Sequence, residues 1–291
     1  MTKVEIDPGA GFCFGVERVI GIAESLLERG ETVYGLGEMV HNQGEVERLK
    51  GLGLKTVTRE QIPSLSEGSL LVRAHGEPPS TYEMAATRPV SVIDGTCPIV
   101  RGLQEKIRKC YASMDRAKEQ LVIFGKSDHP ETIGLLGQVG GDALVVSSAE
   151  DVSAVDPDRG IHLFSQTTMD PDRFSEVEEA LRKRLRGTGV TAFRSDCTIC
   201  GQMKKRKPGL SSFAKDHDVM VFVSGKNSSN GRMLYHFCRS LNPATHWIAG
   251  PAELVPGWFS NAGSVGISGA TSTSREQLEQ VAEAVRKLIF S

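Results

Sequence analysis

The stretch that decides the predicted fold is Ser91-Val92-Ile93-Asp94-Gly95-Thr96-Cys97-Pro98. Its β-branched residues predict a short strand, and the polar residues after them predict a tight turn. Pro98 has the fixed φ that suits the first position of a helix, so Cys97 stands where a strand passes into a helix. There, unpaired backbone N–H groups and the positive end of the helix dipole favour the thiolate, which is the form that attacks electrophiles and binds metals.

The same order of elements occurs twice more in the chain. Residues 3–7 read as a strand, which a glycine-rich turn connects to Cys13 and to an amphipathic helix over residues 16–28. Residues 190–193 read as a strand that leads into Ser195-Asp196-Cys197-Thr198-Ile199-Cys200. A single cysteine is more often a small buried hydrophobe than a ligand, but the repetition at similar intervals predicts three similar units.

We therefore predict an α/β protein built as a trefoil of three similar subdomains, over residues 1–96, 97–194 and 195–291. Strand-like and helix-like segments alternate along the chain, as in parallel α/β sheets. Three thiolates that meet at the middle of such a trefoil would form an incomplete metal or cluster site. One coordination position would then remain for a group that is not protein.

Composition sets the outer limits of the function. The 291 residues are 39% hydrophobic and 24% charged, with a formal charge of −2 and a pI near 6.4, so no basic field predicts a nucleic acid or an anionic membrane as partner. No apolar run is long enough to cross a bilayer, and the first residues lack the apolar core of a signal peptide, which predicts a cytoplasmic protein. Without a secretion signal, the six cysteines are more typical of reduced thiols or ligands than of disulfides.

Polar residues follow the predicted strands of the first two thirds. His41 and His75 come after strands of the first third, and His129, Glu131 and Thr167 come after strands of the second. Ligands of open α/β sheets bind outside the carboxyl ends of the strands, so these residues are placed to meet a substrate. Each histidine could equally be a half-exposed loop residue. Glu131 is a candidate proton donor, with compensation of a helix dipole as an equal alternative.

Two loops of the last third are rich in hydroxyls and amides and precede helices. They contain Ser228, Ser229 and Asn230 in the first case and Ser272 in the second. Such loops hold phosphates, although ordinary helix caps account for most of them. Neither loop is a Walker motif, and no Gly-x-Gly-x-x-Gly follows a strand. Because no bidentate arginine stands at any of these strand ends, the set favours a diphosphate over a carboxylate.

The motifs of this chain resemble those of a known family, the 4-hydroxy-3-methylbut-2-enyl diphosphate reductases. The resemblance runs from Cys13 to about Ser272, with motifs in the family's order and near its spacing. The motifs are Gly11-Phe12-Cys13-x-Gly15-Val16, His41-Asn42, Ala74-His75-Gly76, Asp94-Gly95-Thr96-Cys97-Pro98, His129-Pro130-Glu131 with Gly134 and Gly137, Gln166-Thr167-Thr168 and Asn227-Ser228-Ser229-Asn230.

The resemblance implies a pseudo-threefold α/β trefoil around an oxygen-sensitive [4Fe–4S] cluster, with three cysteine ligands and an open apical iron. Cys13 and Cys97 are two of the implied ligands. The third is a choice between Cys197 and Cys200, and Cys200 is implied because the family's last ligand follows an isoleucine. The implied diphosphate ligands are His41, His75, His129, Thr167, Ser228, Ser229, Asn230 and Ser272.

The implied reaction is the reductive dehydroxylation of 4-hydroxy-3-methylbut-2-enyl diphosphate to isopentenyl and dimethylallyl diphosphate, the last step of the non-mevalonate isoprenoid pathway. Glu131, assisted by Thr167, would deliver protons to the substrate hydroxyl. A ferredoxin or flavodoxin would supply two electrons through the cluster, since no flavin or nicotinamide site is visible. Cys110 and Cys238 match no ligand of the family and are predicted to pack in the core.

The chain departs from the family's pattern after the third cysteine. Met203 removes a hydroxyl, Pro208 and Gly209 are predicted to break the helix, and Ser274 replaces a usual proline. The basic run of residues 204–207 is predicted to be a solvated face or a docking surface for an acidic ferredoxin.

These departures leave alternatives open. One is a paralogue with another diphosphate substrate or a non-catalytic redox-sensing role, although a sensor does not require Glu131 and Thr167. Another is a thioredoxin-like dithiol at residues 197–200, which leaves Cys13 and Cys97 unexplained.

Overall fold

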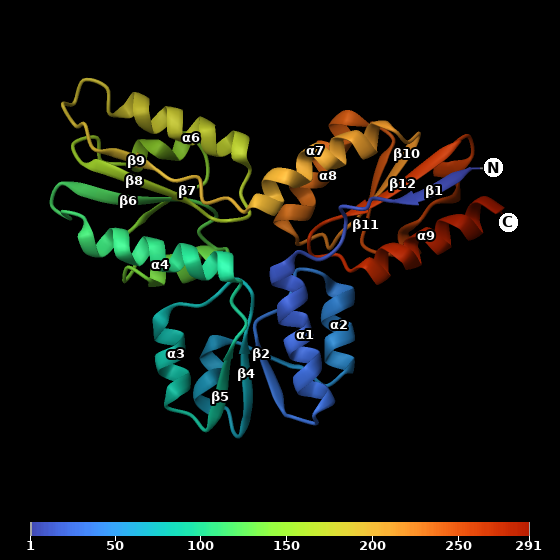
Figure 1. Cartoon of the computed structure of the whole chain (residues 1–291), viewed down its shortest axis with the longest axis horizontal. Helices are drawn as coiled ribbons and strands as arrows, with labels where there is room; N and C mark the ends of the chain where they lie inside the picture. Colours follow the sequence, from blue (N-terminus) through green and yellow to red (C-terminus); the bar gives the residue numbers. More distant parts are fainter. Residues whose placement is uncertain (1, 291) are drawn as a thin grey trace. The chain divides into compact units, whose positions relative to one another are not determined.

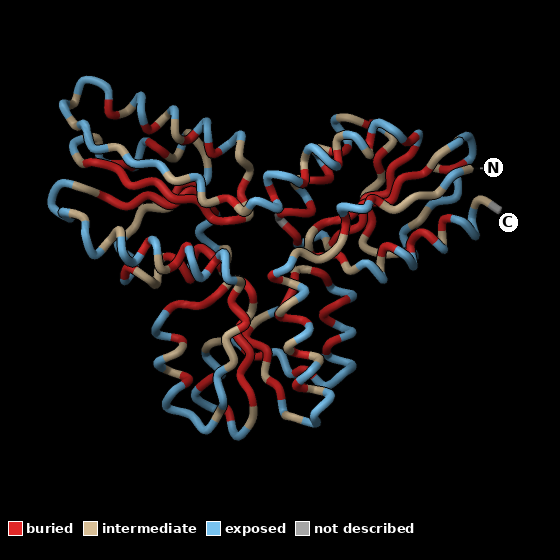
Figure 2. The backbone as a smooth tube through the Cα atoms, in the orientation of Figure 1, coloured by how far each residue is buried: buried red, intermediate tan, exposed pale blue. Residues whose placement is uncertain are grey.

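The computed structural model describes residues 2–290, with the side chains of Ser229 and Phe290 outside this description. In the described chain the strands form three sheets, each of four parallel strands (Figure 1). This confirms the predicted α/β class. The central strands of each sheet are buried along most of their length (Figure 2).

The chain folds into two compact units. The first is built from the chain up to Arg29, from Glu38 to Leu54 and from Gln202 onward; the second is built from Gly30 to Gly37 and from Lys55 to Gly201. None of the described helices is both long enough and apolar enough to span a membrane.

The sheet of the first unit joins the beginning of the chain to its last third. Its strand order is β1-β12-β10-β11, with the bounds Lys3–Ile6, Ser264–Gly269, Val219–Val223 and Thr245–Ile248. β10 alternates between two cores because successive side chains of a strand face opposite sides. Val219, Val221 and Val223 pack with residues of helix α9 (Arg275–Phe290). Met220 and Phe222 pack with residues of α7 (Gly201–Lys215) and α8 (Ser229–Leu241).

Two further helices and two single turns complete the first unit. They are α1 (Phe14–Glu28), α2 (Gln43–Gly51), η3 (Pro251–Glu253) and η4 (Pro256–Phe259). Arg48 of α2 pairs with Glu24 of α1 at 2.6 Å and with Glu45 of its own helix at 2.5 Å. The two helices are thereby joined on their polar sides.

The second unit contains two sheets. The first has the order β3-β2-β4-β5, with the bounds Lys55–Val57, Val33–Leu36, Gly68–Val72 and Val90–Asp94. The second has the order β7-β6-β8-β9, with the bounds Leu144–Val146, Glu119–Phe124, Gly160–Ser165 and Phe193–Ser195. The helices of this unit are η1 (Arg59–Ser64), α3 (Pro79–Ala86), α4 (Pro98–Ser113), α5 (Pro130–Gly137), η2 (Glu150–Ala154) and α6 (Pro171–Arg184).

Two local predictions were wrong. The strand expected at residues 190–193 lies at Phe193–Ser195. The helix expected to break at Pro208 and Gly209 instead continues as α7 to Lys215. A proline inside a helix costs about 3 kcal/mol, and the helix offsets this cost by burying Met203, Arg206, Leu210 and Ala214 on one face.

Candidate functional site

Each of the three predicted cysteine ligands stands at the beginning of a helix. Cys13 is the N-cap of α1, Cys97 is the N-cap of α4, and Cys200 directly precedes α7. All three are half-buried, whereas Cys197 is exposed. Cysteine sulfur is the usual protein ligand of iron–sulfur clusters, so three thiols at helix beginnings supply the donor set that such a cluster requires.

The backbone of each cysteine is tied to a loop that carries a predicted substrate residue. The Cys13 amide donates to the carbonyl of Thr271 at 3.1 Å, beside Ser272. The Cys97 amide donates to Ala74 at 3.0 Å, beside His75. Thr167 itself accepts from the Cys200 amide at 2.9 Å. The sequence repeat thus corresponds to a repeated contact between a cysteine and a strand-end loop.

The segment before Cys200 is held to the second unit by Thr198. Its hydroxyl donates to the Ser165 carbonyl at 2.6 Å and accepts from the Ser165 amide at 2.8 Å. Cys197 lies one residue before this anchor and is exposed, while Cys200 follows it toward the loop of Thr167. These contacts support Cys200 as the third ligand, which stays a prediction.

The second unit brings His75 and His129 together. Their rings meet edge to face, with centroids 5.2 Å apart. His129 is the N-cap of α5, and its Nδ1 accepts from the Glu131 amide at 3.2 Å. This hydrogen bond occupies Nδ1 as an acceptor, so Nε2 carries the proton of the neutral ring.

Two glycines of α5 face the loop of His75. A Cβ at Gly137 would lie 2.4 Å from the Pro78 side chain, and one at Gly134 would lie 3.3 Å from the amide of Gln104. The close packing of α5 on this loop requires glycine at Gly137, whereas a Cβ at Gly134 would reach the backbone of Gly76 at an ordinary 3.5 Å.

The second unit also brings Glu131 and Thr167 together. The Glu131 carboxylate is 1% exposed and accepts from the Thr167 amide at 2.6 Å and from the Thr167 hydroxyl at 2.8 Å. Burial raises the pKa of Glu131 to about 7, although the two hydrogen bonds from Thr167 act to lower it. A carboxyl with this pKa can hold or release a proton near neutral pH. The first turn of α5 does contain Glu131, but the carboxylate is committed to Thr167.

The first unit brings Ser228, Asn230 and Ser272 together. Ser228 caps α8 by accepting from the Gly231 amide at 3.0 Å, and the Ser272 hydroxyl donates to the Ser228 hydroxyl at 3.4 Å. The Asn230 side-chain amide donates to the Thr271 hydroxyl at 2.5 Å. Its own Oδ1 is buried and has no hydrogen-bond partner in the described part of the chain. The predicted Ser229 begins α8, but its side chain lies outside the described residues.

The loop of His41 is fixed within the first unit. Asn42 caps α2 by accepting from the Glu45 amide at 3.3 Å, and it donates to Gln277 of α9 at 2.7 Å. A Cβ at Gly225 would lie 2.8 Å from the His41 carbonyl, so the loop before Ser228 packs closely on this backbone.

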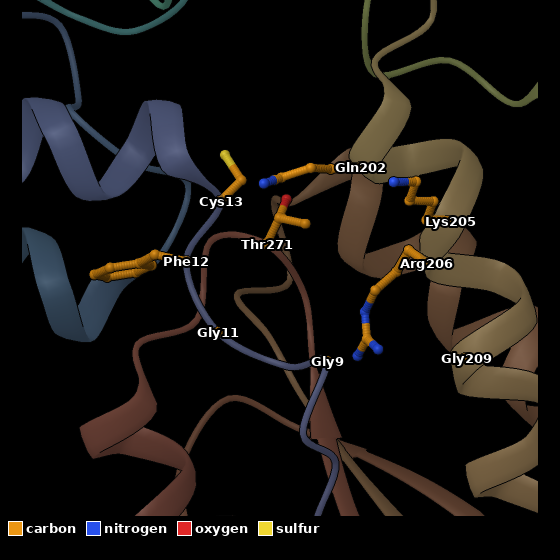
Figure 3. A pocket seen from close by; sticks show the side chains of 9 residues that line it. All are labelled: Gly9, Gly11, Phe12, Cys13, Gln202, Lys205, Arg206, Gly209 and Thr271. Atoms are coloured by element: carbon orange, nitrogen blue, oxygen red, sulfur yellow. The ribbon is translucent and has the colours of Figure 1, made fainter.

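A cavity of about 270 Å³ lies beside Cys13 in the first unit. Cys13, Thr271 and Gln202 point into it, and Lys205 and Arg206 of α7 line its other side (Figure 3). Arg206 pairs with Asp7 at 2.6 Å and donates to Ser268 at 2.6 Å, and both members of the ion pair are buried. The prediction of a solvated basic face was therefore wrong for Arg206.

Sequence reasoning missed Thr271 and Arg206. Thr271 connects Cys13 to Asn230, and its only signal was its place beside Ser272 after a predicted strand. Arg206 anchors the turn before Cys13 through Asp7, 199 positions away. Ser274, which replaces a usual proline, accepts from the Gln277 amide at 3.1 Å and so caps the first turn of α9.

Known proteins resemble this chain over its full length. A family model described as LytB protein matches residues 4–286. The 4-hydroxy-3-methylbut-2-enyl diphosphate reductase of Bacteroides thetaiotaomicron is 44% identical over 289 residues, which are 99% of each chain. The protein of the same name from Porphyromonas gingivalis is 42% identical over 291 residues, covering 99% of this chain and 100% of the other.

Solved structures are similar as well. A structure of (E)-4-hydroxy-3-methyl-but-2-enyl diphosphate reductase, described as the terminal enzyme of the non-mevalonate pathway, is 34% identical, with a TM-score of 0.73 and coverage of 99% of this chain and 100% of that one. The Plasmodium falciparum E-1-hydroxy-2-methyl-but-2-enyl-4-diphosphate reductase is 20% identical, with a TM-score of 0.84 and coverage of 97% and 87%, and so is alike in fold.

Proposed function

The chain belongs to the LytB family of 4-hydroxy-3-methylbut-2-enyl diphosphate reductases, and from this premise we propose how its residues share the work of that reaction. The activity is the reduction of 4-hydroxy-3-methylbut-2-enyl diphosphate, the terminal step of the non-mevalonate pathway. The substrate loses its hydroxyl as water when it takes up two electrons and two protons, and the products are isopentenyl and dimethylallyl diphosphate.

The family implies an iron–sulfur cluster, and we assign Cys13, Cys97 and Cys200 as its ligands. The repeated placement of half-buried thiols at helix beginnings supports this assignment. Three cysteines leave one iron of a [4Fe–4S] cluster without a protein ligand. When bound, the cluster supplies electrons to the substrate and polarises its hydroxyl group.

Histidine, hydroxyl and amide side chains are the proposed ligands of the diphosphate. His75 and His129 present imidazole groups in the second unit, and His41, Ser228, Ser229, Asn230 and Ser272 serve in the first. The unpaired Oδ1 of Asn230 supports this role. If the amide is turned over, its oxygen accepts from the Thr271 hydroxyl and its NH₂ group donates to a phosphate oxygen.

Glu131 is the proton donor, and its geometry is the observation that carries the proposal. A buried carboxyl whose pKa is raised to about 7 is protonated in a large fraction of molecules at neutral pH. The Thr167 hydroxyl, 2.8 Å away, holds the carboxyl and passes its proton toward the substrate hydroxyl. Protonation turns this poor leaving group into water.

The electron donor is an acidic one-electron carrier, a ferredoxin or a flavodoxin, which docks on α7 and α8. Neither helix contains Asp or Glu, and their exposed residues include Lys204, Lys205, Lys215, Arg232 and Arg239. Lys205 also lines the cavity beside Cys13, so this basic surface reaches a proposed cluster ligand. Complementary charge steers such encounters. Both the carrier and a cytoplasmic location stay predictions.

Anaerobic turnover tests the function. Cluster-loaded protein is mixed with a reduced viologen dye and 4-hydroxy-3-methylbut-2-enyl diphosphate, and dye oxidation is followed beside product analysis. We expect oxidation that depends on substrate and yields both diphosphate products. A protein with an intact cluster that oxidises no dye with this substrate would overturn the assignment and favour another diphosphate or a sensing role.

A further inference from the structure

Three reactive side chains of the second unit contact one another in succession, outside the site described above. The Cys110 sulfur on α4 is 3.2 Å from Nδ1 of His162 on β8. Nε2 of the same ring is 3.2 Å from a carboxylate oxygen of Glu119 at the start of β6. A thiol, an imidazole and a carboxylate in this order form the arrangement by which proteins activate a nucleophile.

The fold holds the imidazole rigidly between its two partners. His162 is 5% exposed and lies on a strand that is buried throughout. It stands opposite Leu121 of β6 and Arg194 of β9 in the sheet register. Glu119 accepts from Nε2–H, which leaves Nδ1 as the acceptor for the Cys110 thiol. The tautomer is therefore the one that can take a proton from sulfur.

This group is remote from Cys97, a proposed cluster ligand on the same helix. Cys110 lies near the end of α4, and Cys97 caps its beginning. At 1.5 Å per residue, the 13 positions between them span about 20 Å. Cys110 has no role in the proposed reduction of the diphosphate substrate.

The charges around Cys110 make a base necessary for its reaction. Burial raises the pKa of the Cys110 thiol, Arg194 opposes this effect and Glu119 adds to it. The pKa of Glu119 is lowered by the hydrogen bond from the Asp115 amide and by His162 and Arg194, so this carboxylate is ionised. A protonated thiol attacks only if a neighbour removes its proton, and His162 is in contact.

We propose that Cys110, His162 and Glu119 form a second reactive centre, in which Cys110 reduces small peroxides and becomes a sulfenic acid. The sulfur attacks one peroxide oxygen, so an S–O bond forms as the O–O bond breaks. His162 takes the thiol proton and passes it to the departing oxygen, which leaves as water when the reactant is hydrogen peroxide. The sulfur loses two electrons and the peroxide gains them. Glu119 stabilises the transient imidazolium.

The alternative is that the contact between Cys110 and His162 is only a structural hydrogen bond. Cys110 also packs against the core cluster of Leu103, Ile107 and Leu121, and a weak S–H donor beside a histidine needs no chemistry. The two interpretations differ in whether His162 controls the reactivity of the sulfur.

The test uses the cluster-loaded protein under anaerobic conditions. Iodoacetamide labelling and, separately, trapping of sulfenic acid by dimedone after limiting hydrogen peroxide are quantified for each cysteine by peptide mass spectrometry. Cys197 is the exposed reference, and the fully buried Cys238 is the protected one. We expect Cys110 to react about tenfold faster than Cys197 with both reagents at neutral pH.

His162→Gln should reduce the rate at Cys110 to that of Cys197 or below and leave Cys197 unchanged. Glu119→Gln, at a partly exposed position, should reduce it by a smaller factor, and it carries the test if His162→Gln does not fold. Reaction of Cys110 no faster than Cys197, or rates at Cys110 unaffected by the variant that folds, would overturn the proposal. Fast alkylation without sulfenic acid would overturn the peroxide as its reactant. Dye-driven turnover, measured in parallel, reports separately on the proposed function.

Discussion

Thr167 supplies both hydrogen bonds to the carboxylate of Glu131, one from its amide at 2.6 Å and one from its hydroxyl at 2.8 Å. The two residues are 36 positions apart and come from α5 and from the loop after β8. The hydrogen bond from the Thr167 amide fixes the carboxyl group of Glu131. The Thr167 hydroxyl offers a route for the proton of this carboxyl group.

Glu131→Gln should lower kcat by roughly 10²–10⁴-fold, the usual loss when a general acid is removed. Glutamine has the same shape and can still accept from Thr167, so the cluster and the fold should persist. The measurement is substrate-dependent oxidation of reduced viologen, with the exposed Glu179→Gln on α6 as the matched control. Equal kcat values for the two variants would exclude Glu131 as the acid.

The pH dependence of kcat should show the raised pKa of Glu131. Because the protonated carboxyl is the active form, kcat should fall as pH rises through about 7. A kcat that stays constant to pH values well above 7 would contradict the assignment of Glu131 as the acid. The residual kcat of Glu131→Gln should not show the fall near pH 7.

The free energy of unfolding should also depend on the protonation of Glu131. Its folded pKa of about 7 lies above the ordinary 4.5, so protonation favours the folded chain. This stabilisation is complete below about pH 4.5 and is lost as pH rises through about 7. The shift corresponds to about 3 kcal/mol in the free energy of unfolding. Urea unfolding from pH 5 to 8 should show this decline in the wild type and a flatter curve in Glu131→Gln.

Two serine variants decide which cysteine is the third ligand. Cys200→Ser should lose most cluster iron and visible absorbance, because it removes a thiolate from the beginning of α7. Cys197→Ser should retain both, since Cys197 is exposed. Iron content per chain after anaerobic reconstitution is the measurement. The reverse pattern would assign Cys197 as the ligand.

Charge reversal on α7 and α8 should separate docking from catalysis. Lys204→Glu with Arg232→Glu should lower ferredoxin-driven kcat/KM about tenfold at low ionic strength and leave viologen-driven turnover unchanged. Lys118→Glu, on an exposed surface of the second unit, is the control. Equal effects of the double variant and the Lys118→Glu control, or an equal loss with the dye, would exclude α7 and α8 as the docking surface.

The buried pair of Arg206 and Asp7 should be the support of the Cys13 loop. Arg206→Met should lower the free energy of unfolding by about 3–5 kcal/mol, because it leaves the Asp7 carboxylate buried without its cation. Lys118→Met, which breaks an exposed pair with Asp115, should cost about 1 kcal/mol or less. Urea unfolding of the two variants measures the difference, and similar losses would contradict a structural role for the buried pair.

Much of this protein was determined by the sequence alone. Strands such as β6, β8 and β10 were predicted from apolar runs, since backbone preference and side-chain periodicity act between near neighbours. The positions of Cys13 and Cys97 before helices followed from local turn and proline signals, and both are helix N-caps. The short strands β7 and β11 were missed because three or four residues carry little periodicity.

Only the tertiary structure decided which distant residues meet. Lys3 pairs with Ser264 across β1 and β12, Arg206 reaches Asp7, and Cys110 meets His162. A basic run in the sequence is the same pattern whether its arginine is solvated or buried against a carboxylate, because partner choice depends on how the whole chain packs. For the same reason α7 continues through Pro208. Proline does disfavour the helix locally, but the free energy gained by burying one face of α7 outweighs this cost.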